Sequence, residues 1–150
     1  MIRAAFLAGS IVLALAACAK EEELRVTDAY VRFSPVRQNP SAAYFTVHGG
    51  AQDLSLIAVS SEVAIRSEMH ETMAGHQGMA AMKPITNVQV PAGSTIKFEP
   101  GGKHVMLWNI NPGLAPPKRI SLNLAFSNGE RLKVLAPLVA AGAPAPEQQN

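Results

Sequence analysis

The sequence predicts an all-β protein with a single domain, arranged as a sandwich or barrel of short strands. Apolar and polar residues alternate along several segments, and turn-forming Pro, Gly and Asn residues separate these segments. No stretch has the 3.6-residue periodicity of an amphipathic helix. The chain has 150 residues, of which 48% are hydrophobic, so it is long enough to bury one core.

Nine segments are expected to form strands, at residues 24–33, 42–48, 54–60, 63–69, 86–90, 95–99, 104–110, 119–126 and 132–138. In the first, the apolar phase shifts between Val26 and Ala29, which indicates a β-bulge near Asp28. In the eighth, every second residue from Ile120 is apolar, and a Ser-Asn-Gly turn follows. This pattern predicts a hairpin into the last strand. Pro-Ala-Gly and Pro-Gly-Gly sequences mark two further turns, at 91–93 and 100–102.

Residues 1–17 have the features of a lipoprotein signal peptide. Arg3 supplies positive charge, an apolar run too short to span a bilayer follows, and small residues precede Cys18. The Leu-Ala-Ala-Cys sequence resembles a bacterial lipobox, which implies cleavage before Cys18 and acylation of its thiol. An ordinary secretory peptide that leaves Cys18 as a free thiol is the alternative. Either processing route predicts an exported protein.

The expected organisation is therefore a signal peptide (1–17), a lipidated tether (18–23), a folded domain (24–138) and a disordered tail (139–150) rich in Ala, Pro and Gln. A periplasm-facing envelope lipoprotein is expected. Ala19 and Lys20 lack the aspartate that often retains lipoproteins in the inner membrane, which slightly favours the outer membrane. The net charge is +2 without a Lys/Arg run, so a nucleic-acid partner is excluded.

Soft metal-binding side chains gather in two stretches. Residues 69–82 read MHETMAGHQGMAAM, and a His-Val-Met sequence at 104–106 lies just behind the Pro-Gly-Gly turn. On a strand, His104 and Met106 point to the same side, about 6.6 Å apart. Thioether and imidazole donors without thiolate suit Cu(I), whereas Zn²⁺ prefers Cys, His or acidic ligands and Ca²⁺ or Mg²⁺ prefers oxygen. Copper is the metal that these residue types select.

The spacing of these residues resembles the H(M)X10MX21HXM signature of the periplasmic copper chaperones of the PCu(A)C type. His70 is followed by Glu71 in place of the optional Met, ten residues, Met82, twenty-one residues, and then His104 and Met106 with one residue between them. Further landmarks are similar to that family: Ala-Ala-Tyr-Phe at 42–45, Met-His-Glu-Thr at 69–72, Met-Lys-Pro at 82–84, and the two turns at 91–93 and 100–102. The resemblance covers about residues 26–137.

The resemblance implies a cupredoxin-like, Greek-key β-sandwich that binds one Cu(I) through His70, Met82, His104 and Met106. It also implies a metallochaperone that carries copper to envelope acceptors. A monomer is expected. The expected acceptors are a cytochrome oxidase subunit, for assembly of its copper centre, or a Sco-type protein. The lipid on Cys18 would hold the protein at the membrane. We expect His70 and His104 to be exposed, so that their loss would leave folding nearly intact.

Several soft or aromatic residues have other interpretations. Met73, His76 and Met79 could form an accessory or entry site, although an occupied second site is the less favoured interpretation. Met69 is expected to point into the core, opposite to its neighbours. His48 is given no metal role. Trp108 either shields the metal or packs between the sheets.

Three other classes of function were weighed. A copper sequestration or buffering lipoprotein would use the same site without a dedicated acceptor. A structural envelope lipoprotein would have no metal role. An enzyme is not expected, because the sequence has no nucleophile elbow, no phosphate-binding Gly loop and, once Cys18 is acylated, no free thiol.

Overall fold

The computed structural model describes residues 22–74, 80–111 and 113–147, and in these ranges the regular structure consists of strands. Cys18, His76 and Met79, which have predicted functions, lie outside the described residues. Within the same ranges, no helix is long and apolar enough to cross a membrane.

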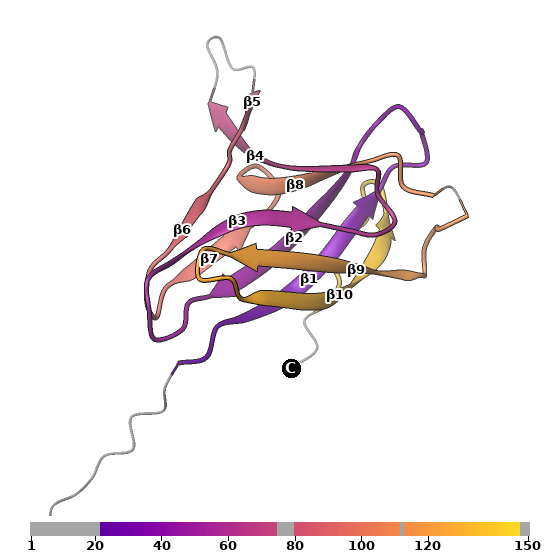
Figure 1. The fold of residues 1–150 in the computed structure, drawn as a ribbon. Helices are drawn as coiled ribbons and strands as arrows, with labels where there is room; N and C mark the ends of the chain where they lie inside the picture. The colour runs from indigo at the N-terminus through magenta and orange to yellow at the C-terminus, as the bar shows by residue number, and fades with distance from the viewer. Residues whose placement is uncertain (1–21, 75–79, 112, 148–150) are drawn as a thin grey trace, which may run out of the picture.

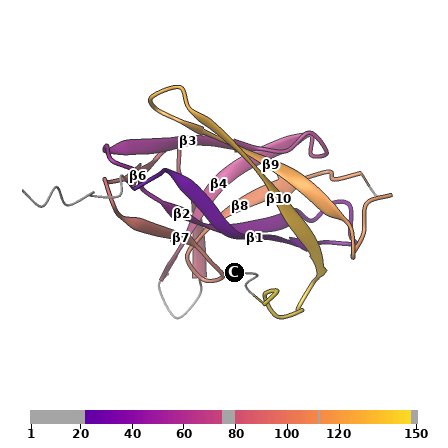
Figure 2. The ribbon, with the colours of Figure 1, turned by 90° about the horizontal axis from the view of Figure 1, so that it is seen from below.

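Ten strands make up the fold (Figure 1). They are β1 (Arg25–Phe33), β2 (Ser41–His48), β3 (Leu54–Ser60), β4 (Arg66–Ala74), β5 (Ala80–Pro84), β6 (Val88–Val90), β7 (Thr95–Phe98), β8 (Lys103–Trp108), β9 (Arg119–Phe126) and β10 (Arg131–Ala140). Their hydrogen-bonded order is β5-β4-β8-β7-β2-β1-β10-β9-β3-β6. The sheet curls so that β9, β3 and β6 lie over β1, β2 and β8, as Figure 2 shows from below. The predicted all-β sandwich is confirmed.

The hydrophobic core lies between these two layers. Along β9, every second side chain is buried, and Leu122 and Leu124 are fully enclosed. The facing layer contributes Phe45, which stacks on Phe98 with ring centroids 4.3 Å apart. Fully burying a side chain of this size contributes about 1.5–3 kcal/mol. The apolar residues that alternate from Ile120 onward therefore form the inward face of a half-buried strand. The predicted hairpin from β9 to β10 is also present.

The predicted bulge in the first strand is also present. The antiparallel register of β1 with β2 shifts between Thr27 and Tyr30, and Asp28 has a φ of 56°. A non-glycine residue in this left-handed region is uncommon outside turns and bulges, and Asp is among the residues that tolerate it. Beyond the bulge, Tyr30 and Val31 are both buried.

Several elements differ from expectation. The strand expected at 63–69 is displaced to β4 (Arg66–Ala74), and β5 (Ala80–Pro84), which was not expected, pairs with it. Residues 81–84 are all exposed, so the sequence of β5 shows no apolar alternation and its pairing depends on the backbone. The last strand continues through Val139 and Ala140, because parallel pairing with β1 extends two residues beyond the expected end.

A tight turn at Pro100-Gly101-Gly102 leads from β7 into β8. The Gly102 N–H donates to the carbonyl of Glu99 (3.0 Å), and Gly101 has a φ of 84° at the third position of the turn. This is the geometry of a type II turn, in which the third residue is usually glycine. The turn fixes the point at which β8 begins, and with it the position of His104.

Replacing Gly101 by Ala should destabilise the protein. No atom lies within 4 Å of the position that a Cβ would take, so the cost arises from the positive φ alone. We expect a loss of about 1 kcal/mol in the free energy of unfolding, measured by denaturant titration. Gly101→Asn should lower the free energy of unfolding by less, because Asn tolerates this left-handed conformation. Equal losses for Ala and Asn would contradict a conformational cause.

Candidate metal site

Three cross-strand pairs of β4 and β8 lie on one face of the sheet. They are His70 with His104, Glu68 with Met106, and Arg66 with Trp108. The two imidazole rings are 6.0 Å apart between centroids, with their planes tilted by 37°. The opposite face of the same two strands is buried in the core, through Met69 and Val105 among others. The expected inward position of Met69 is confirmed.

His104 presents one ring nitrogen without a partner. Its Nδ1 lies 3.0 Å from the carbonyl oxygen of Gly102, which also accepts the N–H of Thr72 at 3.1 Å. Because a carbonyl only accepts, Nδ1 carries the proton and Nε2 carries the lone pair. This Nε2 is buried and has no hydrogen-bond partner among the described residues. An unsatisfied buried acceptor is costly, so it marks a place where a ligand would bind.

His70 has a similar unpartnered nitrogen. Its side chain is only 12% exposed, and its Nε2 lies 3.2 Å from Oε2 of Glu68. Its Nδ1 is buried and, among the described residues, has no partner. His104 is only 4% exposed as a residue, so our expectation that both imidazoles are exposed is wrong. The error arises because this face is covered by the side chains around it, including Tyr44, whose ring lies 6.5 Å from that of His104.

The two methionines predicted as ligands lie on the same face. Met106 is two residues beyond His104 on β8 and pairs across the other edge with Ala42 of β2. Met82 lies on β5 opposite Thr72, which is on the same face of β4 as His70. Met106 is half-buried, whereas Met82 is 57% exposed and lies at the rim. The four residues thus share one face of β5, β4 and β8, and their role as ligands stays a prediction.

Of the residues of the predicted accessory site, Met73 is the one within the described ranges, and it does not join this group. Met73 is exposed and pairs with Ala81 of β5, so the strand alternation directs it to the face opposite to Thr72 and Met82. His76 and Met79 lie outside the described residues, as does Cys18. The accessory site and the lipidation therefore remain predictions.

Aromatic and cationic side chains border the candidate site. The Arg66 guanidinium lies over the Trp108 ring, 4.0 Å from its centroid, and that ring is 6.0 Å from His70. Trp108 therefore lies beside the candidate ligands and not between the two sheets. Burial raises the pKa of the Tyr44 phenol, and the nearby charge of Arg32 opposes this shift. Tyr44 is therefore a neutral ring beside His104.

The donor set does not suit a hard or borderline metal. Among the described residues, no group of three His, Cys, Asp or Glu side chains could hold a metal ion. The predicted ligands on this face are instead two imidazole nitrogens and two thioether sulfurs, and the Glu68 carboxylate lies beside His70. Neutral, soft donors of this kind select Cu(I).

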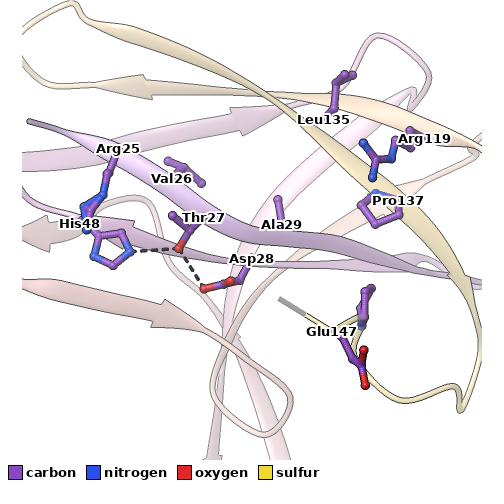
Figure 3. Close-up of a pocket in the computed structure, with 11 residues that line it drawn as sticks. Arg25, Val26, Thr27, Asp28, Ala29, His48, Arg119, Leu135, Pro137 and Glu147 are labelled. Atoms are coloured by element: carbon purple, nitrogen blue, oxygen red, sulfur yellow. Dashed lines mark hydrogen bonds between the residues drawn. The ribbon is translucent and has the colours of Figure 1, made fainter. Parts of the chain in front are cut away.

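His48 lies apart from the candidate site, next to a cavity of about 660 Å³ at the β1 bulge (Figure 3). Its Nε2 is 3.0 Å from Oγ1 of Thr27, and that hydroxyl donates to Asp28 at 2.9 Å. Burial lowers the pKa of His48, with a further lowering from Arg25. His48 is a hydrogen-bonded residue, as expected for a histidine without a metal role.

This fold is the cupredoxin-like β fold of solved PCuAC domains. The copper-bound PCuAC domain from PmoF2 superimposes with a TM-score of 0.64 at 19% identity, over 80% of this chain and 95% of that domain. The solution structure of CuI-DR1885 from Deinococcus radiodurans superimposes with a TM-score of 0.64 at 28% identity, over 83% of this chain and 84% of that one. The resemblance to PCu(A)C-type proteins that the spacing predicted is therefore confirmed.

The chain belongs to the LpqE-like family, whose model, described as "Putative lipoprotein LpqE-like", matches residues 24–138. A relative named "Putative lipoprotein Lxx21020", from Leifsonia xyli subsp. xyli, is 29% identical over 89 residues. The match covers 59% of this chain and 54% of the relative, so the chain spans about half the length of the curated relative it matches. Membership of a lipoprotein family agrees with the lipobox-like sequence before Cys18.

Replacing His104 by Ala should lower stability even without metal. The substitution removes the hydrogen bond to Gly102 and opens a space beside Tyr44 in a buried position. We expect a loss of about 1–3 kcal/mol in the free energy of unfolding of the metal-free protein, measured with denaturant. His48→Ala, at a half-buried position, should lower the free energy of unfolding by less. Unchanged stability in the His104 variant would contradict the burial of this imidazole.

Proposed function

We propose that this protein binds one Cu(I) ion through His70, Met82, His104 and Met106 and acts as a copper metallochaperone in the cell envelope. The observation that carries the proposal is a pair of buried imidazole nitrogens on one face that have no hydrogen-bond partner in the part of the chain that the structure describes. Copper would be the cargo of this site, since a carrier binds the ion and then releases it unchanged. No step of chemical catalysis is required.

The protonation pattern of the two imidazoles supports this proposal. Each ring has one nitrogen occupied by an acceptor, so the other nitrogen is available as a neutral donor. A hydrogen bond from the ring nitrogen that does not bind the metal commonly orients a metal-binding histidine. Two thioethers added to two neutral imidazoles give a ligand set without charge, which favours Cu(I) over Cu(II).

The solved relatives support the choice of metal. The PCuAC domain from PmoF2 has a copper-bound structure, and DR1885 has a structure with CuI. DR1885 is 28% identical to this chain over most of its length. We therefore extend copper binding to this protein as part of the proposal.

The exposure of the candidate ligands favours a carrier over a store. His104 is buried, whereas Met82 on the edge strand β5 is 57% exposed. An acceptor could replace an exposed thioether first, without opening the core. Neutral His and Met donors also exchange more readily than a pair of thiolates would.

The proposed setting is the periplasmic side of the cell envelope, with Cys18 acylated. The proposed acceptors are the copper site of a cytochrome oxidase subunit or a Sco-type protein. A lipid anchor would confine the protein to a membrane surface, where an acceptor in the same membrane is within reach.

The first test is a competition titration of the purified protein with Cu(I) against a chromophoric chelator of known affinity. We expect tight binding of one equivalent, which Ala at His70 or His104 and Leu at Met82 or Met106 each weakens by at least tenfold. Trp108 is the single tryptophan and lies 6.0 Å from His70, so its fluorescence should fall until one equivalent is bound.

The matched controls change the same residue types: His48→Ala lies apart from the candidate site, and Met69→Leu changes a side chain on the opposite face of β4. Both should retain the wild-type affinity. Weak copper binding by the wild-type protein, or binding that none of the four ligand variants reduces, would overturn the proposal and favour a structural lipoprotein.

A second test separates delivery from sequestration. We expect the Cu(I)-loaded protein to transfer its ion to a metal-free CuA domain or Sco-type protein from the same cell within minutes. In a control, a dialysis membrane keeps the two proteins apart and a soluble Cu(I) chelator carries the ion between them. Transfer in this control should be slower. Equal rates with and without contact between the proteins would favour a copper buffer over a chaperone.

A further inference from the structure

We propose that Glu68 is a positioning residue for the copper site, which keeps the proton of His70 on Nε2 and thereby presents Nδ1 to the metal. This inference rests on the proposed function, because it concerns how one of the proposed ligands is prepared. It assigns no direct contact between Glu68 and copper.

The geometry places the carboxylate beside His70. Glu68 precedes His70 by two residues on β4, so both side chains lie on the same face, and Glu68 is the cross-strand partner of Met106. Its Oε2 lies 3.2 Å from Nε2 of His70. An ionised carboxylate only accepts hydrogen bonds, so the contact requires a proton on Nε2. In the neutral imidazole, which is the form that binds a metal, the lone pair then lies on the buried Nδ1.

Different acceptors hold the two histidines in opposite tautomers. A backbone carbonyl, that of Gly102, holds the proton of His104 on Nδ1, whereas a carboxylate holds the proton of His70 on Nε2. The nitrogens without a partner are therefore Nε2 of His104 and Nδ1 of His70. Since the nitrogen that binds a metal is set by the hydrogen bond of the other, copper should bind these two nitrogens.

Glu68 is itself held in place. Its second carboxylate oxygen, Oε1, lies 3.5 Å from a terminal nitrogen of Arg66, and this guanidinium lies over Trp108. The two oxygens thus have separate partners. With Arg66 and Glu68 exposed to 56% and 40%, solvent screens the pair, so its contribution to stability is small. The consequence of the contact is the orientation of the carboxylate.

The same contact has a competing explanation with the opposite sign. Glu68 could occupy a nitrogen that copper needs, and so act as a barrier to binding. Removing the carboxylate would then strengthen copper binding, whereas removing a positioning group weakens it. The direction of the change in affinity separates the two explanations.

The first experiment identifies the copper-binding nitrogens by long-range ¹H–¹⁵N NMR on the ¹⁵N-labelled protein. Without metal, His70 should be protonated at Nε2 and unprotonated at Nδ1. Added Cu(I) should shift the Nδ1 signal of His70 and the Nε2 signal of His104, while the Nε2 proton of His70 remains. A metal-induced shift at Nε2 of His70 would overturn the inference and leave the proposed function intact. No response at either imidazole would overturn both.

The second experiment measures Cu(I) affinity in variants of Glu68. We expect Glu68→Leu to bind about 10- to 100-fold more weakly, and Glu68→Gln to lie in between, because its carboxamide oxygen can still accept from Nε2. Glu71→Gln is the matched control, since Glu71 is 39% exposed and also has a cation partner, Lys103 at 2.8 Å. Its affinity should equal that of the wild type.

Three outcomes would overturn the role of Glu68. They are a gain of affinity in Glu68→Leu, an unchanged affinity in that variant, and an equal loss in Glu71→Gln. A denaturant titration of each metal-free variant accompanies the affinities, and Glu68→Gln keeps the test decisive if Glu68→Leu folds poorly.

Discussion

The antiparallel register of β4 and β8 is the constraint on which the candidate site depends. It sets His70 directly across from His104, although 33 residues separate them in the sequence. A slip of one residue would turn His70 toward the core and Met69 toward solvent, because side chains alternate along a strand. Burial of Met69 and Val105 on the inner face opposes such a slip. The hydrophobic core therefore fixes the positions of polar side chains that do not belong to it.

The carbonyl of Gly102 connects this register to the chemistry of the site. It accepts the backbone N–H of Thr72 from β4 and the imidazole N–H of His104 from β8. This one carbonyl oxygen thus helps to align β4 with β8 and selects the tautomer of His104. The left-handed conformation of Gly101 makes the turn that presents this carbonyl. The result is a preorganised pair of imidazoles whose free nitrogens raise the energy of the metal-free protein, since buried acceptors without partners are unfavourable.

Local patterns in the sequence predicted most strands, the bulge at Asp28, the last hairpin and the shared face of His104 and Met106. These features depend on alternation and turn residues, which are properties of neighbouring positions. The strand β5 was missed because its residues 81–84 are exposed and carry no apolar pattern. The burial of His104 was missed because it depends on Tyr44, a residue of another strand, and the approach of Glu68 to His70 could not be seen in spacing alone. A local sequence pattern carries no information about contacts between strands that are distant in the sequence.

The fold also arranges the candidate donors by depth. His104 is buried beside the turn, His70 has little exposure, Met106 is half-buried, and Met82 projects from the edge strand β5. In the proposed site, the two nitrogens therefore come from β4 and β8, whose inner faces are buried in the core, while one sulfur lies at the rim of the sheet. Because ligand exchange starts where a competing donor can approach, copper held by this set would leave from the Met82 side. A site built in this order combines a fixed position for the ion with an accessible route of release, which is the pair of properties that a carrier needs and a structural metal site lacks.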